Sequence, residues 1–155
     1  MNIVLRKSEA TDWQTIQKLN QEVIENSTQF DVYLNVNDAF TDDSVIDYQK
    51  TVVDPDKFCI IAEDAGSPVG YLVGGVSNNS WRLNKRGEIF HMGVSPSYRG
   101  QGIGKQLVDA FKAWCKERSI THISATTYFN DDKARKFYEK QGMTPIDVSL
   151  EGKIN

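Results

Sequence analysis

Apolar residues recur at helical spacing in two stretches of the chain, one in each half. In the first half they share one face of a helix that begins after Thr11, whose pairing with Gln14 three residues on matches a capping box. The members of this face are Ile16, Leu19, Val23 and Ile24. In the second half the same period follows Gly104, at Leu107, Val108, Phe111, Trp114 and Cys115. Both stretches are predicted to be amphipathic helices packed on a sheet.

Short apolar runs predict the strands of that sheet, at residues 3–7, 58–62, 69–73, 88–94, 120–126 and 143–150. Turn residues at 64–68 join the second and third runs into a hairpin, and residues 77–80 form a second loop on the way to the fourth. Residues 26–55 are polar and irregular, and we expect loop there with one short helix at 44–51. Asn130 is placed to cap a last helix, which Gly142 ends.

The order of these elements predicts a mixed sheet with helices on both faces. Hairpins early in the chain give antiparallel neighbours, whereas the later alternation of strand and helix gives crossover connections. At 155 residues the chain has the size of one ordinary domain. We therefore expect an α/β (α+β) fold, organised as a single domain over residues 1–155.

Composition and charge exclude several functions. The hydrophobic fraction of 39% and the charged fraction of 25% are average for a folded globular protein. The net charge of -3 argues against nucleic-acid binding, because that affinity comes from clustered lysine and arginine. No uncharged apolar run reaches the ~18 residues that cross a bilayer, and residues 1–7 lack the apolar core of a signal peptide. We expect a cytoplasmic protein with neither nucleic-acid nor membrane partners.

The two cysteines fall in regular structure. Cys59 lies in a predicted strand and Cys115 in a predicted helix, where buried free thiols are common. Neither has the CxxC or Cys/His spacing of a zinc site, so that no metal is expected.

Residues 94–105 carry most of the chemical information, and they lie between a predicted strand and a predicted helix. Gly100, Gly102 and Gly104 let the main chain approach a ligand closely. The helix that follows directs its free N–H groups and the positive end of its dipole at the same point. The segment is therefore predicted to bind an anion, and a pyrophosphate suits it best.

Two common phosphate-binding loops do not fit these residues. A Walker A loop needs glycine at position 99 and serine or threonine at position 106, where the chain has Arg99 and Gln106. The dinucleotide-binding pattern GxGxxG needs glycine or alanine at position 105, where the chain has Lys105. Neither an ATP-binding P-loop nor a Rossmann domain is expected.

The segment instead resembles a family motif. Residues 99–104, Arg-Gly-Gln-Gly-Ile-Gly, resemble the Q/R-x-x-G-x-G/A signature of the GNAT superfamily of acetyl-CoA-dependent N-acetyltransferases, and the preceding Val94-x-Pro96-x-x-Arg99 is typical of the same family. A second run, around the last predicted helix, is also similar to a GNAT motif. Its members are Asn130, Ala134, Phe137, Tyr138 and Gly142. The resemblance covers residues 88–143.

The resemblance implies both a fold and a reaction. The fold is a GNAT-like mixed, mostly antiparallel sheet of six to seven strands with about four helices on both faces. The reaction takes acetyl-CoA as co-substrate, without a metal, and an amine attacks the thioester directly in a ternary complex. Homodimers are common among similar proteins, so the resemblance also admits a homodimer.

The same resemblance implies where acetyl-CoA is held. Met92, Gly93 and Val94 would pair with the pantetheine arm as an added strand does, and the N–H of Val94 would hold the thioester oxygen. The amides of the glycine-rich segment would bind the pyrophosphate, and Asn130 would contact the pantetheine amide as well as cap its helix. The full set of expected cofactor-binding residues is Met92, Gly93, Val94, Arg99, Gly100, Gln101, Gly102, Ile103, Gly104, Lys105, Asn130 and Phe137.

Acetyl transfer needs a base, because an amine is protonated at neutral pH. Glu88 stands six residues before Val94, the spacing of the glutamate base of some family members. Strand alternation places Glu88, Phe90, Met92 and Val94 on one face unless a β-bulge intervenes. His91 is the rival base, with an unperturbed pKa near ~6.5. The alternatives are a solvated carboxylate and a structural histidine, and the latter is also expected for His122.

The reaction also needs an acid for the departing thiolate, and Tyr138 is the candidate. Its place in the second motif matches the tyrosine that family members use for this step. A phenol of pKa ~10 can donate to a thiolate of pKa ~8.5 as charge builds on the sulfur. The alternative is a core aromatic beside Phe137.

The acceptor is predicted from the charge of the middle segment. Seven aspartates, against only Lys50 and Lys57, favour a small cationic amine such as a polyamine or an aminoglycoside. They are Asp31, Asp38, Asp42, Asp43, Asp47, Asp54 and Asp56. Five aromatics could wall an apolar acceptor pocket or belong to the core: Tyr33, Phe40, Tyr48, Trp81 and Tyr128. A protein N-terminus or lysine is the competing acceptor, and a non-catalytic acyl-CoA-binding sensor is the competing function.

Overall fold

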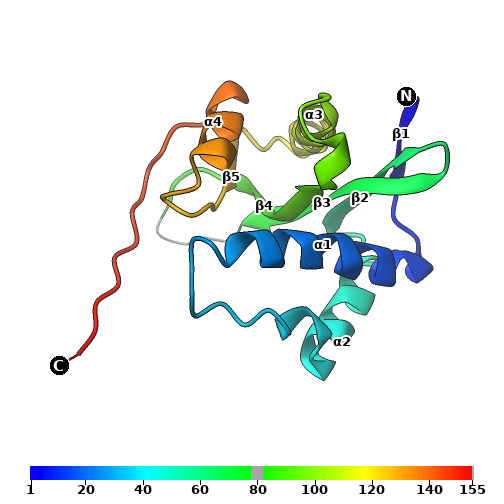
Figure 1. Cartoon of the computed structure of the whole chain (residues 1–155). Helices are drawn as coiled ribbons and strands as arrows, with labels where there is room; N and C mark the ends of the chain where they lie inside the picture. The colour runs from blue at the N-terminus through cyan, green and yellow to red at the C-terminus, as the bar shows by residue number, and fades with distance from the viewer. Residues whose placement is uncertain (78–81, 155) are drawn as a thin grey trace.

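The structure is a computed structural model that describes residues 1–77 and 82–154. Its strands form one sheet in the order β1-β2-β3-β4-β5 (Figure 1). The pairs from β1 to β4 are antiparallel, and β4 pairs with β5 in parallel. The bounds are β1 Ile3–Lys7, β2 Lys57–Asp64, β3 Ser67–Ser77, β4 Arg86–Val94 and β5 His122–Ala125. The prediction of a mixed, mostly antiparallel sheet is confirmed, but the described residues contain five strands instead of six to seven.

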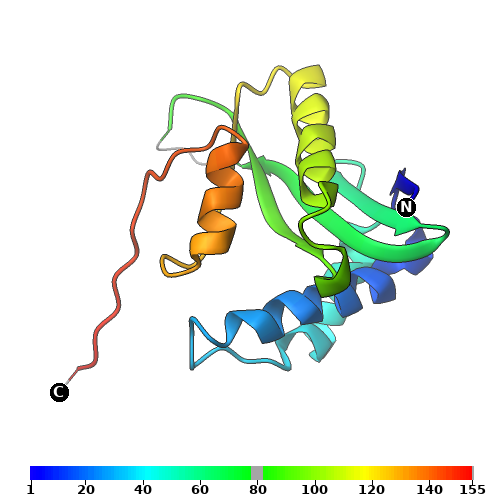
Figure 2. The same cartoon turned by 45° about the horizontal axis from the view of Figure 1, so that its top comes forward.

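The helices of the described residues cover both faces of the sheet. They are α1 Trp13–Ser27, α2 Asp42–Thr51, α3 Ile103–Glu117 and α4 Asp132–Lys140. Figures 1 and 2 show α1 and α2 on one face and α3 and α4 on the other. Short 3-10 turns precede α1, α2 and α3, at η1 Ala10–Asp12, η2 Asp38–Phe40 and η3 Pro96–Tyr98. The helix expected at 44–51 is therefore present as α2.

Each face of the sheet has its own apolar core. On the α3 side, fully buried Leu107 and Phe111 pack against Leu72 of β3, and Met92 of β4 and residues of α4 pack around them. On the α1 side, Ile16 packs against Tyr71. Successive residues of β3 thus alternate between the two cores, as side chains of a strand do. The helical spacing seen in the sequence is confirmed on both faces.

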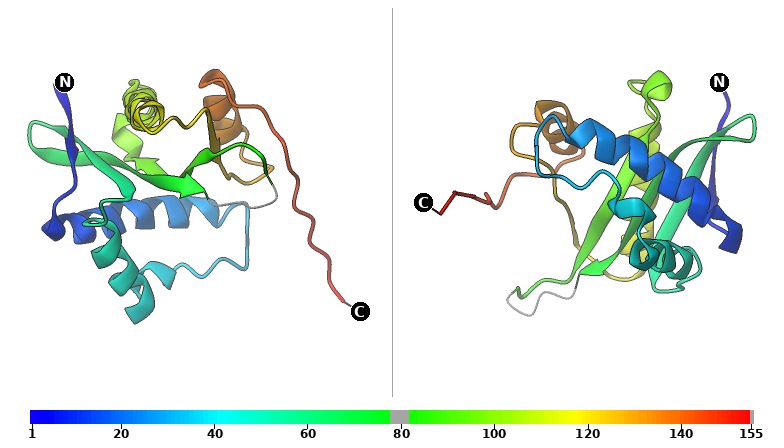
Figure 3. Two further views of the ribbon diagram at one scale, coloured as in Figure 1. Left: turned by 180° about the vertical axis from the view of Figure 1, so that it is seen from behind. Right: turned by 60° about the horizontal axis from the view of Figure 1, so that its bottom comes forward.

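Residues 143–150, predicted to be a strand, form none. They are extended and, after Met143, exposed, and Figure 3 shows this segment leaving α4 and running away from the rest of the molecule. Alternating apolar residues make a strand only where a neighbouring strand supplies hydrogen bonds, and the described residues supply none here. The strand predicted over residues 120–126 is longer than the observed one, because pairing with β4 is confined to His122–Ala125.

The ends of two helices differ from prediction by a few residues. Thr11 and Gln14 do not cap α1. Its N-cap is Asp12, which makes no side-chain capping hydrogen bond to the helix, and the Asp12 carboxylate accepts from the N–H of Glu9 before η1 at 2.6 Å. The cap of α4 is Asp131, whose Oδ1 accepts from the N–H of Ala134 at 2.9 Å, and not Asn130. A cap is fixed by which oxygen reaches an N–H of the first turn, and one residue of drift changes it.

Other predicted boundaries are confirmed. Gly142 ends α4 with a φ of 87°. The hairpin between β2 and β3 turns at Ala65 and Gly66, both with positive φ. Residues 78–80 of the second predicted loop lie outside the described residues. Cys59 and Cys115 are buried free thiols, and burial raises the pKa of Cys115 to about 11, so that this thiol is inert at neutral pH.

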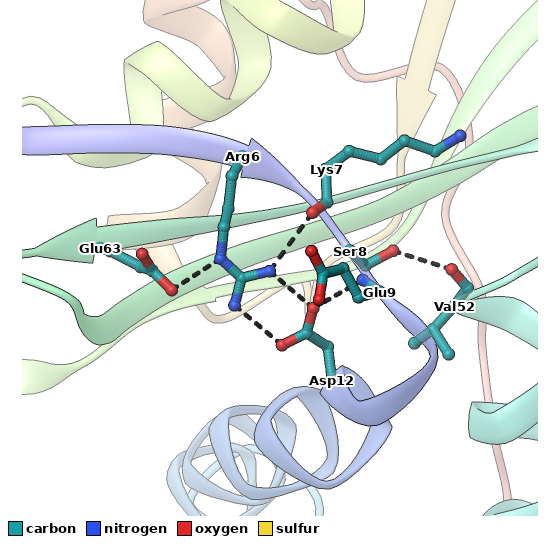
Figure 4. Close-up of polar contacts among 7 residues, drawn as sticks. All are labelled: Arg6, Lys7, Ser8, Glu9, Asp12, Val52 and Glu63. Atoms are coloured by element: carbon teal, nitrogen blue, oxygen red, sulfur yellow. Dashed lines mark hydrogen bonds and ion pairs between the residues drawn. The ribbon is translucent and has the colours of Figure 1, made fainter.

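A charged cluster fixes β1 and the start of α1 to the sheet (Figure 4). The guanidinium of Arg6 donates to both carboxylate oxygens of Asp12, at 2.6 and 2.8 Å, and its Nε donates to Glu63 of β2 at 2.7 Å. Beside it, the hydroxyl of Ser8 donates to the carbonyl of Val52 at 3.0 Å. The hydrogen bonds from Arg6 hold the pKa of Asp12 below its ordinary value.

Candidate active site

The strands β4 and β5 separate part-way along the sheet. Their parallel pairing ends at Ile89 and Ala125, where β5 stops, and β4 continues to Val94 with only β3 as its neighbour among the described residues. A free strand edge presents N–H and C=O groups to an extended ligand. All three residues predicted to pair with the pantetheine arm lie on this stretch: Met92, Gly93 and Val94.

A β-bulge in β4 decides which side chains face which core. Val73 pairs with His91 and the next residue of β3, Gly74, pairs with Ile89, so that Phe90 is the extra residue. Phe90 and His91 both line a cavity on the α2 side of the sheet. The bulge therefore presents two consecutive side chains of β4 to the same side.

The bulge also places Glu88. This residue stands opposite Gly75, and a Cβ on Gly75 would meet Phe90 and Lys57. Because paired residues of adjacent strands share a face, Glu88 belongs to the α2 side. Met92 and Val94 pack on the α3 side instead. The four residues that strict alternation would put on one face are thus divided between two.

The glycine-rich segment forms an open turn before α3. Gly100 and Gly102 have φ of 77° and 84°, values that favour glycine, and a Cβ on either would meet no atom within 4 Å. Gly102 is the N-cap of α3, so that the first amides of the helix have no partner within it. The exposed side chains of Arg99 and Gln101 donate to carbonyl oxygens of the same segment, Arg99 to Val94 at 2.8 Å and Gln101 to Ser97 at 3.0 Å. The main chain at Gly100 and Gly102 is thus open to a ligand.

The start of α3 is held from both sides. Ile103, 1% exposed, anchors it in the core, whereas Lys105 is exposed. Gly104 packs against α4: a Cβ there would lie 3.1 Å from the ring of Phe137 and 3.8 Å from Met92. Phe137 therefore lies where the glycine-rich segment meets the free edge of β4.

Tyr138 packs beside this junction. Its ring makes an edge contact with Phe137, with centroids 5.1 Å apart, and it borders the α3-side core. Burial, and then the charge of Asp131, raise the pKa of Tyr138 to about 12. The phenol is therefore fully protonated at neutral pH. Asn130 is exposed at the start of α4, and since Asp131 serves as the cap, its amide is not needed for that role.

A cavity of about 380 Å³ opens on the α2 side of β4. Its lining is strongly charged, with two aspartates and two lysines around a histidine: Asp47, Lys50, Thr51, Asp54, Lys57, Val73, Phe90 and His91. The ammonium of Lys57 lies 4.4 Å from the centre of the Phe90 ring. Acidic and basic groups thus line the same cavity.

His91 is held by a chain of hydrogen bonds that crosses from the sheet to both helices. Its Nδ1 lies 3.3 Å from the hydroxyl of Tyr71, which donates to Oδ1 of Asn20 in α1 at 2.7 Å. The amide of Asn20 then donates to the hydroxyl of Tyr48 in α2 at 2.6 Å. Since Tyr71 gives its proton to Asn20, its oxygen accepts from His91, and Nδ1 carries the imidazole proton. Nε2 is left as the acceptor on a side chain that lines the cavity.

The surroundings of His91 keep it neutral. Burial lowers its pKa to about 4, and the nearby carboxylate of Asp47 opposes the shift without cancelling it. Burial also raises the pKa of Tyr71 and of Tyr48, so that both hydroxyls keep their protons. Lys50, Lys57 and Asp54 are the other charged groups that line the cavity with it.

The predicted acidic and aromatic acceptor walls do not assemble as a whole. Of the seven aspartates, two line the cavity, Asp47 and Asp54. Tyr33 and Phe40 are mostly exposed, and Tyr128 stacks on Phe30 away from the cavity lining. Of the predicted aromatics within the described residues, Tyr48 is the one in ring contact with His91, with centroids 6.1 Å apart. Trp81 lies outside the described residues, and His122 is exposed at the start of β5.

Sequence reasoning missed Asn20 and Tyr71, which position His91. A signal for Asn20 was present, since it lies on the apolar face of the first helix, between Leu19 and Val23. A polar side chain on such a face needs a partner. Tyr71 carried no comparable signal, because a tyrosine in a central strand is ordinarily a core residue.

The residues present fit acetyl-CoA. Free amides at the start of α3, open space around Gly100 and Gly102, and the free edge of β4 suit a pyrophosphate followed by an extended amide arm. No group of three or more His, Cys, Asp or Glu side chains within residues 1–77 and 82–154 is placed to bind a metal ion. No helix in the same residues is long and apolar enough to cross a membrane.

A model of the "Acetyltransferase (GNAT) family" matches residues 16–143, most of the chain. The chain belongs to this family. Among curated relatives, this GNAT chain is 33% identical over 87 residues to Acetyltransferase SG1711 of Sodalis glossinidius, a stretch that covers 56% of each protein. The match thus spans little more than half of that relative.

Two solved structures share the GNAT fold along nearly the whole chain. A single-residue mutant of the BH1408 protein from Bacillus halodurans superimposes with a TM-score of 0.86 at 18% identity, over 98% of this chain and 99% of that one. AAC(6')-Iy, in complex with the bisubstrate analog CoA-S-monomethyl-acetylneamine, superimposes with a TM-score of 0.75 at 16% identity, over 100% and 99%. At these identities the likeness concerns the fold.

Proposed function

We propose that this GNAT chain transfers an acetyl group from acetyl-CoA to an amine by direct attack in a ternary complex. The observation that carries the proposal is the bulge at Phe90. On one side of it the free edge of β4 and the glycine-rich turn suit the coenzyme, and on the other side a charged cavity suits an acceptor. The amine nitrogen would bond to the acetyl carbon as the carbon–sulfur bond breaks, giving the amide and free coenzyme A.

The coenzyme side is proposed to act through the main chain. Amides from Arg99 to Lys105 would bind the pyrophosphate, Met92, Gly93 and Val94 would pair with the pantetheine arm, and the N–H of Val94 would hold the thioester oxygen. The open space around Gly100 and Gly102 supports this, and the side chains of Arg99 and Gln101 donate to main-chain carbonyl oxygens that shape the turn. Asn130 and Phe137 would contact the arm from α4.

His91 is the proposed base, in place of Glu88, which the sequence favoured. His91 lines the cavity and presents a free Nε2, held by the hydrogen bond from its Nδ1 to Tyr71. Its low pKa keeps the imidazole neutral throughout the neutral range. Because a pKa of about 4 also makes it a weak base, His91 would take the proton once the nitrogen has become acidic by bonding to the acetyl carbon. Glu88 is on the same side of the sheet but is not among the residues that line the cavity.

Tyr138 is the proposed acid. With a pKa of about 12 the phenol keeps its proton at neutral pH, so Tyr138 would remain a hydrogen-bond donor and would offer this proton to the sulfur as negative charge develops there. The proton lost by the amine to His91 and the proton gained by the sulfur balance over one turnover, once solvent returns both groups to their starting states.

The proposed acceptor is a small cationic amine, of the polyamine or aminoglycoside kind. Asp47 and Asp54 in the cavity support it, and so does the acetylneamine part of the ligand bound by AAC(6')-Iy. Lys50 and Lys57 in the same lining argue against a densely charged polycation, so we expect an amine with few positive charges. A protein N-terminus or lysine is the competing acceptor.

The test is thiol release from acetyl-CoA, screened over polyamines, aminoglycosides and peptides with free N-termini or lysines. Turnover of a small amine supports the proposal. Turnover of peptides alone would show that the acceptor is a protein amine. Saturable acetyl-CoA binding without turnover of any amine would support a non-catalytic sensor. We expect His91→Gln to lower kcat about 100-fold or more with an unchanged KM for acetyl-CoA, and Tyr138→Phe to lower kcat about 10-fold or more.

Glu88→Gln is the matched control for the base, because it changes a neighbouring side chain on the same face of β4. We expect it to keep kcat within a few fold. A larger loss of kcat in Glu88→Gln than in His91→Gln would return the base role to Glu88.

A further inference from the structure

A second cavity lies at the end of the sheet away from the glycine-rich turn. Its volume is about 460 Å³, and it is lined by Asp56, Lys57, Val76, Lys85 and Arg118. These residues stand at the start of β2, near the end of β3, just before β4 and at the C-cap of α3. The glycine-rich turn precedes α3, so the fifteen residues of this helix separate the two places by about 22 Å. The cavity is therefore distinct from the proposed coenzyme site.

The lining carries three positive side chains against one negative, Asp56. Within residues 1–77 and 82–154, neither lysine of this lining forms an ion pair, and Arg118 reaches Glu117 at a long 3.8 Å on the exposed surface. The chain as a whole has a net charge of -3, so the excess of positive charge is a local property of this cavity. Such a cavity favours an anion.

Two of the three cations are held in place by aromatic rings. The guanidinium of Arg118 lies 4.1 Å from the centre of the Trp114 ring, and Trp114 stacks on the buried ring of Phe111 with centroids 5.6 Å apart. The ammonium of Lys57 lies 4.4 Å from the centre of the Phe90 ring. Side chains that are already ordered lose less conformational entropy when a ligand binds. The positive groups are thus partly prepared for an anion.

We propose that this cavity binds the phosphate group of a small phosphate ester. Three cations suit a dianionic phosphate better than a carboxylate with one charge, and an arginine can donate two parallel hydrogen bonds to phosphate oxygens. The cavity is larger than a phosphate ion and Val76 gives it an apolar wall, so it has room for the organic part of an ester. Binding of the phosphate does not depend on the acetyl-transfer reaction.

Lys57 connects this cavity with the proposed acceptor cavity, because its side chain lines both. In the acceptor cavity its positive charge opposes a cationic amine. A phosphate bound beside Lys57 would offset that charge, so the ester and the amine should each bind more tightly in the presence of the other. This coupling rests on the proposed transfer of an acetyl group to a cationic amine.

Calorimetry with glycerol 3-phosphate and with inorganic phosphate tests the site. We expect glycerol 3-phosphate to bind saturably to the wild type and at least ~10-fold more weakly to Lys85→Gln with Arg118→Gln, at an unchanged circular dichroism spectrum. The matched control is Lys116→Gln with Lys133→Gln, which removes as much charge from exposed positions outside the lining and should bind as the wild type does.

Three outcomes overturn the proposal. They are the absence of saturable glycerol 3-phosphate binding, equal affinities in the wild type and in the variant of Lys85 and Arg118, and binding of inorganic phosphate without the ester. Tighter binding of glycerol 3-phosphate than of inorganic phosphate supports the ester.

The coupling is measured by thiol release from acetyl-CoA with a small amine as acceptor. At constant ionic strength, saturating glycerol 3-phosphate should lower the KM for the amine about threefold or more, and Lys57→Gln should abolish this effect. An unchanged KM with the ester bound overturns the coupling. Failure of every amine to react would instead contradict the acetyl-transfer proposal, and calorimetry would still decide whether the cavity binds phosphate.

Discussion

His91 lies between a tyrosine hydroxyl and a cavity lined by charged groups. Its Nδ1 faces Tyr71, and Tyr71 is fixed in turn by Asn20 of α1. The ring is therefore oriented by residues of three different elements. Burial lowers the pKa of His91 to about 4, which keeps the oriented ring neutral at neutral pH and also makes it a weak base.

The shifted pKa of His91 makes stability depend on pH. The folded pKa lies below the unfolded value of ~6.5, so between these values the unfolded chain binds more protons and stability falls as the pH falls. We expect His91 to cost the wild type about 2 kcal/mol at pH 5 relative to pH 7, an upper estimate from the shift. Urea unfolding at both pH values measures it.

His91→Gln should remove most of that pH-dependent loss. An equal pH dependence in the wild type and in His91→Gln would show that the ring is solvated, and the base assignment would lose its support.

Among the elements, the turn before α3 was the one that its own residues predicted most directly. Glycine at 100 and 102 predicted a main chain open to a ligand, and both positions have positive φ with no neighbour near a Cβ. The sequence predicted the helix caps less accurately. Thr11, Gln14 and Asn130 had suitable side chains, but α1 begins after the 3-10 turn η1 without a side-chain cap, and Asp131, one residue after Asn130, caps α4.

Gly102→Ala tests this turn, and Gly66→Ala is its matched control. Both glycines have φ near 80° and open space around a Cβ, so each substitution should destabilise the fold by a similar ~1 kcal/mol. Only Gly102 lies where the pyrophosphate is proposed to bind. We expect calorimetry to show acetyl-CoA affinity reduced at least ~10-fold by Gly102→Ala and unchanged by Gly66→Ala; equal affinities would contradict the proposed site.

At the scale of the whole molecule, contacts between segments distant in sequence attach the helices to the sheet. Arg6, Asp12 and Glu63 link the first strand, the start of α1 and β2, with one arginine shared between two carboxylates. Asp12 is 7% exposed, so its charge depends on that arginine. Removing the negative charge of Asp12 should weaken the attachment of α1 to the sheet. Asn20, which helps to orient His91, belongs to this helix.

We expect Asp12→Asn to lower the free energy of unfolding by about 2 kcal/mol at pH 7, because a charge-assisted bidentate contact is lost. The pKa of Asp12 is lowered in the folded state, so its contribution is present above the ordinary carboxyl range and is lost as the pH falls through the folded pKa. The difference between wild type and variant should therefore shrink toward acid pH in urea titrations.

Asp132→Asn is the control, since its carboxylate pairs with Arg135 on the exposed surface of α4 and should change stability by less than about 0.5 kcal/mol. Similar losses in the two variants would mean that the Arg6 cluster is no stronger than a surface ion pair.

The local pattern of residues was sufficient for the helices, for four of the strands, for the open turn before α3 and for the family, because periodicity, glycine placement and motif spacing are properties of short stretches. It did not determine which face of the sheet Glu88 lies on. One extra residue in a bulge exchanges the faces of the residues before it relative to those after it, and the bulge depends on the pairing of β3 with β4. It was insufficient also for residues 143–150, where an alternating pattern needs a neighbouring strand to become one. The orientation of His91 likewise arises only when α1, α2, β3 and β4 come together.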